Sequence, residues 1–276
     1  MSRQTDNWSS EAYQHAASFV PKLAGKVMEW LDPQKDDVIL DIGCGDGVLD
    51  VQIGQILAQG TGRLHGVDSS AAMIAASQKA VQASGINNCT FEVLDCNDLV
   101  TRPELQKQQF TKAFSNAAMH WILRAEDKQE QFFRGVAAAV RPGGTFAFEM
   151  GGLGNVSELA VGIMGPVARR IGLERARQAN PWFFPDEEWT RRMMEERVGG
   201  WKVERVEREW RPTPADAGGV EGWVRLMGKQ FFDAVPEAQR EECVREALGP
   251  LEAVCARPDG GYIFHYVRLR VLARRV

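Results

Sequence analysis

The stretch that decides the fold is Val38-Ile39-Leu40-Asp41-Ile42-Gly43-Cys44-Gly45-Asp46-Gly47. Its first half is a short apolar run with β-branched residues, which is typical of a buried parallel strand. Three alternating glycines follow, and a stretch with helical spacing begins at Val48. Glycine tolerates positive φ and lets a ligand approach the backbone closely. The stretch therefore predicts a strand, a turn suited to ligand binding, and a helix.

The alternation of strands and helices continues through the first half of the chain. Further strands are expected at 64–68, 90–95, 113–115 and 145–150, and further helices at 70–83 and 127–140. Such alternation predicts a parallel sheet with helices on both faces and right-handed crossovers. Another helix is expected before the first strand, from about Ser10 to Trp30, because Pro33 breaks the helical pattern.

The pattern changes after Met150, where a glycine-rich break covers 151–154. Strands are expected at 201–210 and 262–271, with helices at 222–235 and 236–248 between them. The predicted fold is α/β, with a doubly wound, mostly parallel seven-stranded sheet and a helical lid or insertion after the fifth strand. We expect one domain in three parts: an N-terminal helical cover (1–35), a ligand-binding α/β core (36–150), and a lid plus the terminal strands of the same sheet (151–276).

Acidic residues follow the second and third predicted strands. Asp68 and Asp95 end these strands at the carboxyl edge of the sheet, where ligands bind in open α/β folds. The dinucleotide spacing G-x-G-x-x-G fails because Val48 stands at the last position. A carboxylate at Asp68 is placed to accept both hydroxyls of an unphosphorylated ribose. An acidic site without a partner lysine or arginine indicates a cationic nucleoside ligand.

These features resemble the class I methyltransferases that use S-adenosylmethionine, which have a Rossmann-like fold. The resemblance covers about residues 36–150 and rests on DIGCGDG (41–47), GVDSS (66–70), VLDCNDL (93–99), FSNAAMHW (114–121) and VRPGGTFAFEM (140–150). FSNAAMHW and the segment 257–269 are similar to the trans-aconitate methyltransferase group, whose members methylate small acids and related metabolites. The resemblance implies S-adenosylmethionine as cofactor and O-methylation of a small carboxylic acid.

The resemblance also implies a set of cofactor-binding residues. In it the glycines line the methionine part of the cofactor, Asp68 holds the ribose, and Asp95 flanks the adenine. The full set is Trp8, Tyr13, Asp41, Gly43, Cys44, Gly45, Gly47, Asp68, Ser69, Met73, Asp95, Cys96, Asn116 and Ala117. Trp8 and Tyr13 match a segment that covers the cofactor, and Asn116 and Ala117 match positions beside the sulfonium.

Each assignment has a competing structural interpretation. The glycines also suit a plain tight turn, Asp68 a helix N-cap, and Asp95 a surface turn. Cys44 and Cys96 are expected to be buried small hydrophobes rather than reactive thiols, and Trp8 and Tyr13 suit ordinary helix packing. His120 is the candidate catalytic base, since histidine titrates near neutral pH. For His120 a structural or substrate-orienting role is the favoured alternative.

The nature of the acceptor stays open at this point. A carboxylate is ionised at neutral pH, so it needs no general base, and cationic side chains are expected to hold it. The candidate cations are Arg225, Lys229, Arg257 and Arg268, then Arg124 and Arg169. Large apolar residues between 182 and 264 instead favour a hydrophobic specialised metabolite, methylated on O, N or C. A third interpretation is a cofactor-binding protein without transfer activity.

Composition excludes several other classes of protein. The 276 residues are 44% hydrophobic and 25% charged with a net charge of −4, which excludes a disordered tail and disfavours a nucleic-acid partner. The proline-containing element of many amino-group methyltransferases is replaced by Ser115-Asn116-Ala117-Ala118. The five scattered cysteines indicate no metal site. Apolar runs fall short of the ~20 residues of a membrane span, so we expect a cytoplasmic protein without a membrane partner and leave its oligomeric state open.

Overall fold

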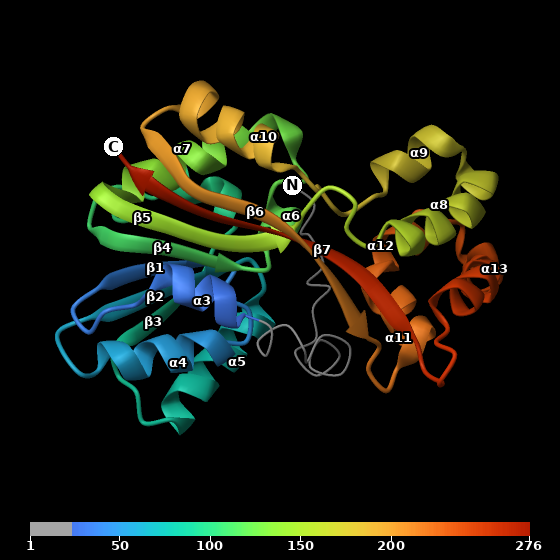
Figure 1. Cartoon of the computed structure of the whole chain (residues 1–276), viewed down its shortest axis with the longest axis horizontal. Coiled ribbons are helices and arrows are strands. Elements are labelled where there is room, and N and C mark those ends of the chain that lie inside the picture. Colours follow the sequence, from blue (N-terminus) through green and yellow to red (C-terminus); the bar gives the residue numbers. More distant parts are fainter. Residues whose placement is uncertain (1–23) are drawn as a thin grey trace.

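The computed structural model describes residues 24–276 (Figure 1), and across them the strands form one seven-stranded sheet ordered β3-β2-β1-β4-β5-β7-β6. The strands from β1 to β5 pair in parallel, whereas β7 runs antiparallel to both β5 and β6. The strands are β1 (Val38–Ile42), β2 (Arg63–Asp68), β3 (Cys89–Val93), β4 (Phe110–Asn116), β5 (Val140–Gly151), β6 (Trp201–Pro214) and β7 (Ile263–Arg275). This arrangement confirms the predicted fold class.

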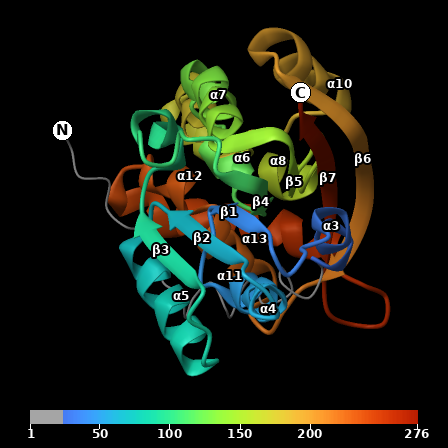
Figure 2. The ribbon, with the colours of Figure 1, turned by 90° about the vertical axis from the view of Figure 1, so that its left-hand side faces the viewer.

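Helices cover both faces of the sheet (Figures 1 and 2). One face carries α3 (Gly25–Leu31), α4 (Val48–Leu57) and α5 (Ala71–Ala83), and the other carries α7 (Gln129–Ala139), α10 (Glu187–Arg191) and a π-helical turn, η3 (Arg192–Val198). Successive strand residues point to opposite faces. In β1, Ile39 therefore packs in the core with α3 and α4, whereas Leu40 and Ile42 pack in the core with α7.

Short elements follow the carboxyl ends of β3 and β4. They are the 3-10 turn η1 (Cys96–Thr101), helix α6 (Met119–Ile122) and the 3-10 turn η2 (Glu126–Lys128). β3 ends at Val93, not at 95, because the Asp95 side chain accepts a hydrogen bond from the Asn97 N–H and caps η1. These short elements place the residues after β3 and β4 at the same edge of the sheet as the glycine turn.

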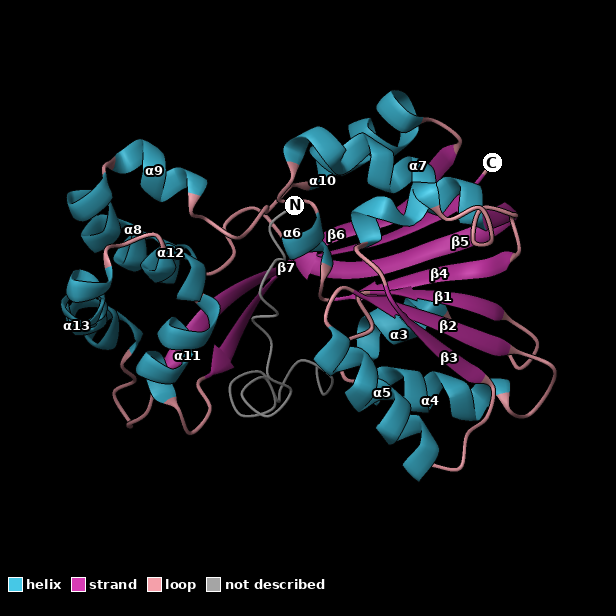
Figure 3. Cartoon of the chain, turned by 180° about the vertical axis from the view of Figure 1, so that it is seen from behind, coloured by secondary structure: helices cyan, strands magenta, loops and turns pink. Residues whose placement is uncertain are grey.

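A second hydrophobic core lies beyond the end of the sheet (Figure 3). It is built by α8 (Ser157–Ile171), α9 (Leu173–Gln178), α11 (Gly219–Met227), α12 (Lys229–Asp233) and α13 (Glu237–Cys255), here called the helical lobe. β7 pairs with β5 only from Arg268 onward, but it pairs with β6 from Ile263. The two strands thus continue past β5 as a ribbon, and Phe264 and Tyr266 of this ribbon belong to the core of the lobe.

Three predicted boundaries in the helical lobe and at β5 were wrong. The helices expected at 222–235 and 236–248 are three helices, because α11 ends before Gly228 and α13 continues through Pro250 to Cys255. Leu251 and Cys255 remain buried in the lobe, which favours the continuation of α13. β5 begins at Val140, which pairs with Phe110 ahead of an irregular stretch, rather than at 145.

Only the end of the predicted N-terminal helix falls within the described residues, where it is α3. Its terminal residue Leu31 is buried, and Asp32 follows in the left-handed conformation with φ of 45°. The earlier part of that helix, with Trp8 and Tyr13, lies outside the described residues.

Candidate functional site

A cavity of about 600 Å³ lies at the carboxyl edge of β1 to β4. Its sheet side is formed by the glycine turn after β1 and by the residues that follow β2, β3 and β4. Its opposite side is formed by Pro181 and by α11 and α12 residues of the helical lobe. One side of the cavity is therefore the site predicted from the sequence, and the other side belongs to the helical lobe.

The glycine turn is fixed by hydrogen bonds to β2. The N–H groups of Gly43 and Cys44 donate to the Val67 carbonyl oxygen at 2.8 and 3.1 Å. Gly43 has φ of +73°, and a Cβ there would overlap the methyl group of Ala118. A Cβ on Gly45 would meet no atom of residues 24–276 within 4 Å, because Gly45 lines the cavity. The turn thus packs tightly at Gly43 and leaves open space at Gly45.

Asp68 connects the glycine turn to the start of α5. Its Oδ2 accepts a hydrogen bond from the Gly45 N–H at 3.1 Å, and its Oδ1 accepts one from the Ser70 N–H at 2.9 Å. Ser70 in turn caps α5 by accepting from the Met73 N–H at 3.2 Å. Asp68 also lines the cavity. The structural and the ligand-binding interpretations of this carboxylate are therefore compatible.

The residues after β3 form the adjoining part of the wall. Asp95 Oδ1 accepts from the Asn97 backbone N–H at 3.0 Å and from Asn97 Nδ2 at 3.2 Å. Asn97 also lines the cavity and was missed in the sequence, although it adjoins the predicted Asp95 and Cys96. Burial raises the pKa of the Cys44 and Cys96 thiols. Both are therefore neutral thiols near pH 7 and unsuited to nucleophilic chemistry.

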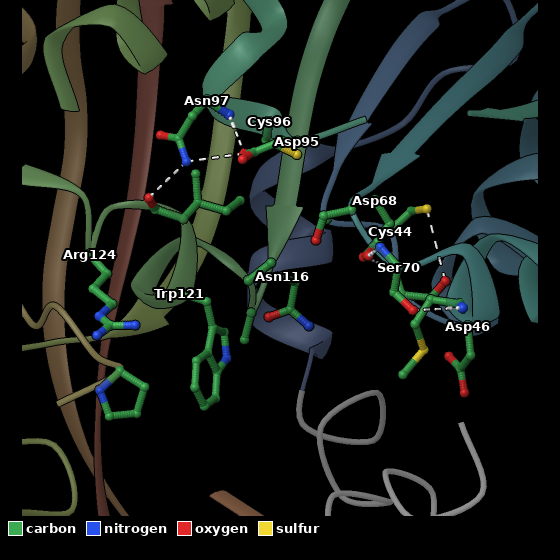
Figure 4. A pocket seen from close by; sticks show the side chains of 18 of the residues that line it. Cys44, Asp46, Asp68, Ser70, Asp95, Cys96, Asn97, Asn116, Trp121 and Arg124 are labelled. Carbon is green, nitrogen blue, oxygen red and sulfur yellow. Dashed lines mark hydrogen bonds between the residues drawn. The ribbon is translucent and has the colours of Figure 1, made fainter. Parts of the chain in front are cut away.

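Asn116 lies in the middle of the site (Figure 4). Its Nδ2 atom is buried and has no hydrogen-bond partner among residues 24–276. A buried amide donor of this kind costs free energy unless something accepts its hydrogen bond. Figure 4 shows Arg124 and Trp121 on one side of Asn116 and Asp46 and Asp68 on the other. Ser69, Met73 and Ala117 of the predicted set also line the cavity.

His120 does not line the cavity. The Gly151 N–H points at its Nδ1 from 3.5 Å, and its ring centroid lies 5.4 Å from that of Trp121 and 5.8 Å from that of Phe184. Burial and, to a smaller extent, the nearby charge of Arg268 hold the pKa of His120 well below its usual range. The imidazole is neutral near pH 7 and packs behind Trp121, which does line the cavity.

Asp41 and Gly47 lie behind the cavity wall. A Cβ on Gly47 would lie 2.7 Å from the Ser77 Cβ, so this glycine packs against α5. Asp41 is buried beside Asp50 of α4. Burial raises the pKa of Asp50 to about 7, and burial together with the Asp50 charge also raises the pKa of Asp41. Two buried carboxyl groups in contact hold a proton between them at neutral pH.

This shared proton predicts a dependence of stability on pH. An acid whose pKa is raised by folding keeps a proton that the unfolded chain releases. The free energy of unfolding therefore falls as the pH rises from 3.8, the usual value, to about 7, by about 1.4 kcal/mol per pH unit for one proton. Asp50→Asn preserves the shape and donates to Asp41 without a titrating proton, so we expect it to flatten this decline.

Urea unfolding at pH 5, 6, 7 and 8 measures the effect. The gain in stability of Asp50→Asn over the wild type should grow with pH up to about 7, the pKa of Asp50. Asp127→Asn, at an exposed residue of η2, is the control and should run parallel to the wild type. A profile of Asp50→Asn that also runs parallel to the wild type would contradict the shared proton.

Most of the candidate cations are paired with carboxylates away from the cavity. Arg225 donates to both carboxylate oxygens of Glu241 at 3.0 and 2.9 Å, and Arg257 pairs with Asp259 at 2.7 Å. Arg268 is buried on Glu149, and Arg169 pairs with Glu246. Of the six candidates, Arg124 and Lys229 line the cavity.

The large apolar residues mainly fill the protein interior. Trp182, Trp223, Phe231 and Phe232 belong to the core of the helical lobe. Within the described chain, Met227 alone lines the cavity among the residues on which the hydrophobic acceptor was predicted, which are Trp182, Phe183, Phe184, Trp189, Trp223, Met227, Phe231, Phe232 and Phe264. The aromatic density of the second half is therefore explained by the second core.

Comparison with known proteins agrees with this geometry. A family described as a methyltransferase domain matches residues 39–144, which run from β1 into β5. An uncharacterized methyltransferase of Schizosaccharomyces pombe is 36% identical over 273 residues, which are 98% of this chain and 98% of that protein. The chain belongs to the methyltransferase family.

Solved structures share the fold of this methyltransferase. The YcgJ protein from Bacillus subtilis has a TM-score of 0.59 at 12% identity and covers 91% of this chain and 97% of its own. The Haemonchus contortus phosphoethanolamine N-methyltransferase 2, solved with phosphomonomethylethanolamine and S-adenosylhomocysteine, has a TM-score of 0.58 at 16% identity, covering 99% of this chain and 58% of its own. The protein is a class I methyltransferase that uses S-adenosylmethionine.

The residues of the cavity fit this cofactor. The open space at Gly45 admits a ligand against the backbone, and Asp68 is a carboxylate acceptor beside that space. The unpartnered Asn116 donor lies between them and Trp121. In residues 24–276, no helix has the length and apolar character needed to cross a membrane. Within the same residues, no group of three or more His, Cys, Asp and Glu side chains is placed to hold a metal ion.

Proposed function

We propose that this methyltransferase methylates an oxygen of a small carboxylic acid, as the trans-aconitate methyltransferase group does. The observation that carries the proposal is the opposite charge at the two ends of one cavity. Asp46 and Asp68 lie on one side of Asn116 and Arg124 lies on the other (Figure 4), and Lys229 of α12 lines the wall that the helical lobe forms. The acidic end suits a cationic nucleoside, and the basic end suits an anionic acceptor.

The proposed cofactor residues are those of the acidic end. Gly43, Gly45 and Asp68 receive the methionine and ribose parts, and Asp95 lies beside the base. Asn116 offers its amide to the region between cofactor and acceptor. In this proposal the helical lobe is the lid that covers the acceptor, which extends the expected division into a core (36–150) and a lid with terminal strands (151–276).

The proposed reaction needs no general acid or general base. S-adenosylmethionine, when bound, supplies a methyl group on a sulfonium, whose transfer to a carboxylate oxygen forms an O–C bond and leaves the electron pair of the broken C–S bond on sulfur. A carboxylate is ionised near pH 7 and has no proton to lose. The chain's task is therefore to orient the acceptor and exclude water. His120 is proposed as a positioning residue that supports Trp121, with which its ring is in contact.

The composition of the cavity wall also helps to distinguish between the alternative acceptors. A hydrophobic metabolite would require an apolar pocket. Leu226, Met227 and Trp121 supply some apolar surface, but three cations stand beside them in the described wall. This composition favours a small acid over a hydrocarbon-rich acceptor. A cofactor-binding protein without transfer activity would form no methylated product, so a transfer assay distinguishes it from both kinds of methyltransferase.

Transfer of labelled methyl groups from S-adenosylmethionine to a panel of acceptors tests the proposal. The panel contains trans-aconitate and citrate, aromatic acids such as benzoate, phenols and amines. We expect label on at least one acid, in a product that mild base hydrolyses, because esters are labile and ethers or amines are not. Label on phenols or amines alone, in a base-stable product, would contradict the carboxylate. Bound S-adenosylhomocysteine with no labelled product would favour the protein without transfer activity.

A further inference from the structure

Three basic side chains line the cavity, and their surroundings differ. Lys229 Nζ lies 2.5 Å from Asp233 Oδ2, and Lys128 Nζ lies 3.8 Å from Asp98 Oδ1. Each lysine therefore has a carboxylate that offsets its charge before any ligand arrives. Arg124 differs from them, because its hydrogen-bond partners are neutral.

The partners of Arg124 both belong to the helical lobe. Its Nη1 donates to Gln230 Oε1 at 2.8 Å, and its Nη2 donates to the Gln178 carbonyl oxygen at 2.8 Å. Among the described residues it has no ion pair, and partial burial of this still exposed side chain lowers the pKa of its guanidinium. An arginine carries five N–H donors in a rigid fork, so donors remain for a further acceptor. The side chain is a positive charge, held in place by neutral groups, on the wall of a ligand cavity.

We propose that Arg124 binds the anionic group of the acceptor and thereby determines acceptor specificity. The inference rests on the proposed function, since it assumes an acceptor at the lobe end of the cavity. Gln230 and Gln178 hold the guanidinium in place, and the anion supplies a countercharge that residues 24–276 do not provide. An arginine recognises carboxylate and phosphate by the same paired N–H donors. The anionic group is therefore a carboxylate or a phosphate.

Binding of anionic probes to the S-adenosylhomocysteine complex tests this role. Isothermal titration calorimetry with trans-aconitate, citrate, benzoate and inorganic phosphate is run on the wild type, Arg124→Gln and Arg124→Lys. We expect Arg124→Gln to weaken the binding of the best probe by about 10- to 100-fold, the usual loss for a charge-assisted hydrogen bond. Arg124→Lys should recover part of the affinity, because it restores charge without the fork. The affinity for S-adenosylhomocysteine itself should be unchanged.

Gln230→Glu separates anion recognition from simple contact between the lobe and the core. This change places a carboxylate at the atom that lies 2.8 Å from Arg124 Nη1 and keeps the contact with the lobe. If Arg124 serves the anion, Gln230→Glu weakens probe binding about as much as Arg124→Gln, because the charge is neutralised internally. If Arg124 only fastens the lobe, Gln230→Glu leaves probe binding intact or strengthens it. Arg225→Gln, whose charge is already matched by Glu221 and Glu241, is the control.

The outcomes distinguish this inference from the proposed function. Equal binding of the anions to the wild type and Arg124→Gln overturns the inference, as does a wild-type complex that binds none of them. Binding of phosphate but not of carboxylates supports Arg124 and overturns the carboxylic acid. Failure of the wild type to bind S-adenosylhomocysteine refutes the cofactor site instead. Thermal melts of each variant show that lost binding is not lost folding.

Discussion

Asp68→Ala is expected to weaken the binding of S-adenosylhomocysteine by about 100-fold or more, because it removes the carboxylate that we propose accepts two charge-assisted hydrogen bonds from the ribose. The same carboxylate fixes the glycine turn through the Gly45 N–H and the start of α5 through the Ser70 N–H. Its removal therefore loosens the turn as well as removing the acceptor. Both effects act in the same direction on cofactor affinity, which calorimetry measures directly.

Two matched variants separate the ligand contact from the structural one. Asp36 accepts hydrogen bonds from the Thr61 backbone N–H at 2.9 Å and from its hydroxyl at 3.0 Å, so it also fastens a loop. Asp36→Ala should cost a similar amount of stability and leave cofactor binding at the wild-type level. Asp68→Asn keeps an acceptor for Ser70 but loses the charge, and its affinity should fall between the wild type and Asp68→Ala. Near-normal affinity of Asp68→Ala would refute the ribose assignment.

The gathering of the proposed cofactor-binding residues around one cavity could be predicted, because the patterns that place them are local in the sequence. The apolar run before Gly43 fixes β1, and the next strands repeat the pattern until Asp68 and Asp95 stand at the same sheet edge. Parallel strands joined by helices allow few other arrangements. The carboxyl ends of β1, β2 and β3 then lie side by side, which places these residues around one cavity.

The acceptor end could not be predicted in the same way. Arg124 is separated from Gln178 and Gln230 by more than 50 residues, and nothing in its own neighbourhood marks it out from other arginines. Arg124 is distinguished by having no carboxylate partner within residues 24–276, whereas Arg225 and Arg257 have such partners close in sequence. The absence of a partner becomes visible only when the helical lobe is placed against the core.

In the helical lobe and the strands beside it, the spacing of hydrophobic residues predicts some elements and misses the full length of others. Leu159, Ile163 and Val167 recur at helical spacing and mark α8, although Pro166 within the same helix argues against it locally. The strand expected at 201–210 continues to Pro214, because 211–214 pair with the part of β7 that packs on the helical lobe beyond β5. The strand expected at 262–271 continues to Arg275, and residues 272–274 of this extension pair with β5 inside the sheet.

The buried pair of Asp41 and Asp50 illustrates a different limit. Asp41 belongs to the glycine motif, and its position suggests a ligand contact. In the structure it lies behind the wall, where its neighbour is a second carboxyl group from the first turn of α4. The pairing of two acids cannot be read from either segment, because it depends on how α4 packs against β1. The consequence is a stability that depends on pH rather than a direct contribution to binding.

The glycines of the turn are expected to separate into a packing residue and a ligand-facing residue. Gly47→Ala should destabilise the protein by about 3 kcal/mol, since left-handed backbone costs about 1 to 2 kcal/mol for alanine and overpacking adds a similar amount. Its Cβ would lie 2.7 Å from the Ser77 Cβ and 2.8 Å from the Ser77 Cα, so relief requires α5 to move. At Gly45 φ is +60°, but an added Cβ would meet no atom of the described chain within 4 Å, so we expect only the backbone cost.

For cofactor binding, we expect the substitution at Gly45 to have a larger effect than the substitution at Gly47. The methyl group of Gly45→Ala would occupy the space that the backbone leaves for the ligand, so we expect affinity for S-adenosylhomocysteine to fall by about tenfold or more, the equivalent of at least ~1.4 kcal/mol. Gly85→Ala is the control, because Gly85 also has positive φ, +69°, with no atom within 4 Å, and lies after α5 away from the cavity. Urea unfolding should group Gly45→Ala with Gly85→Ala, and calorimetry should separate them. Wild-type affinity in Gly45→Ala would mean that the open space at this glycine does not receive the cofactor, and the assignment of the turn would have to be withdrawn.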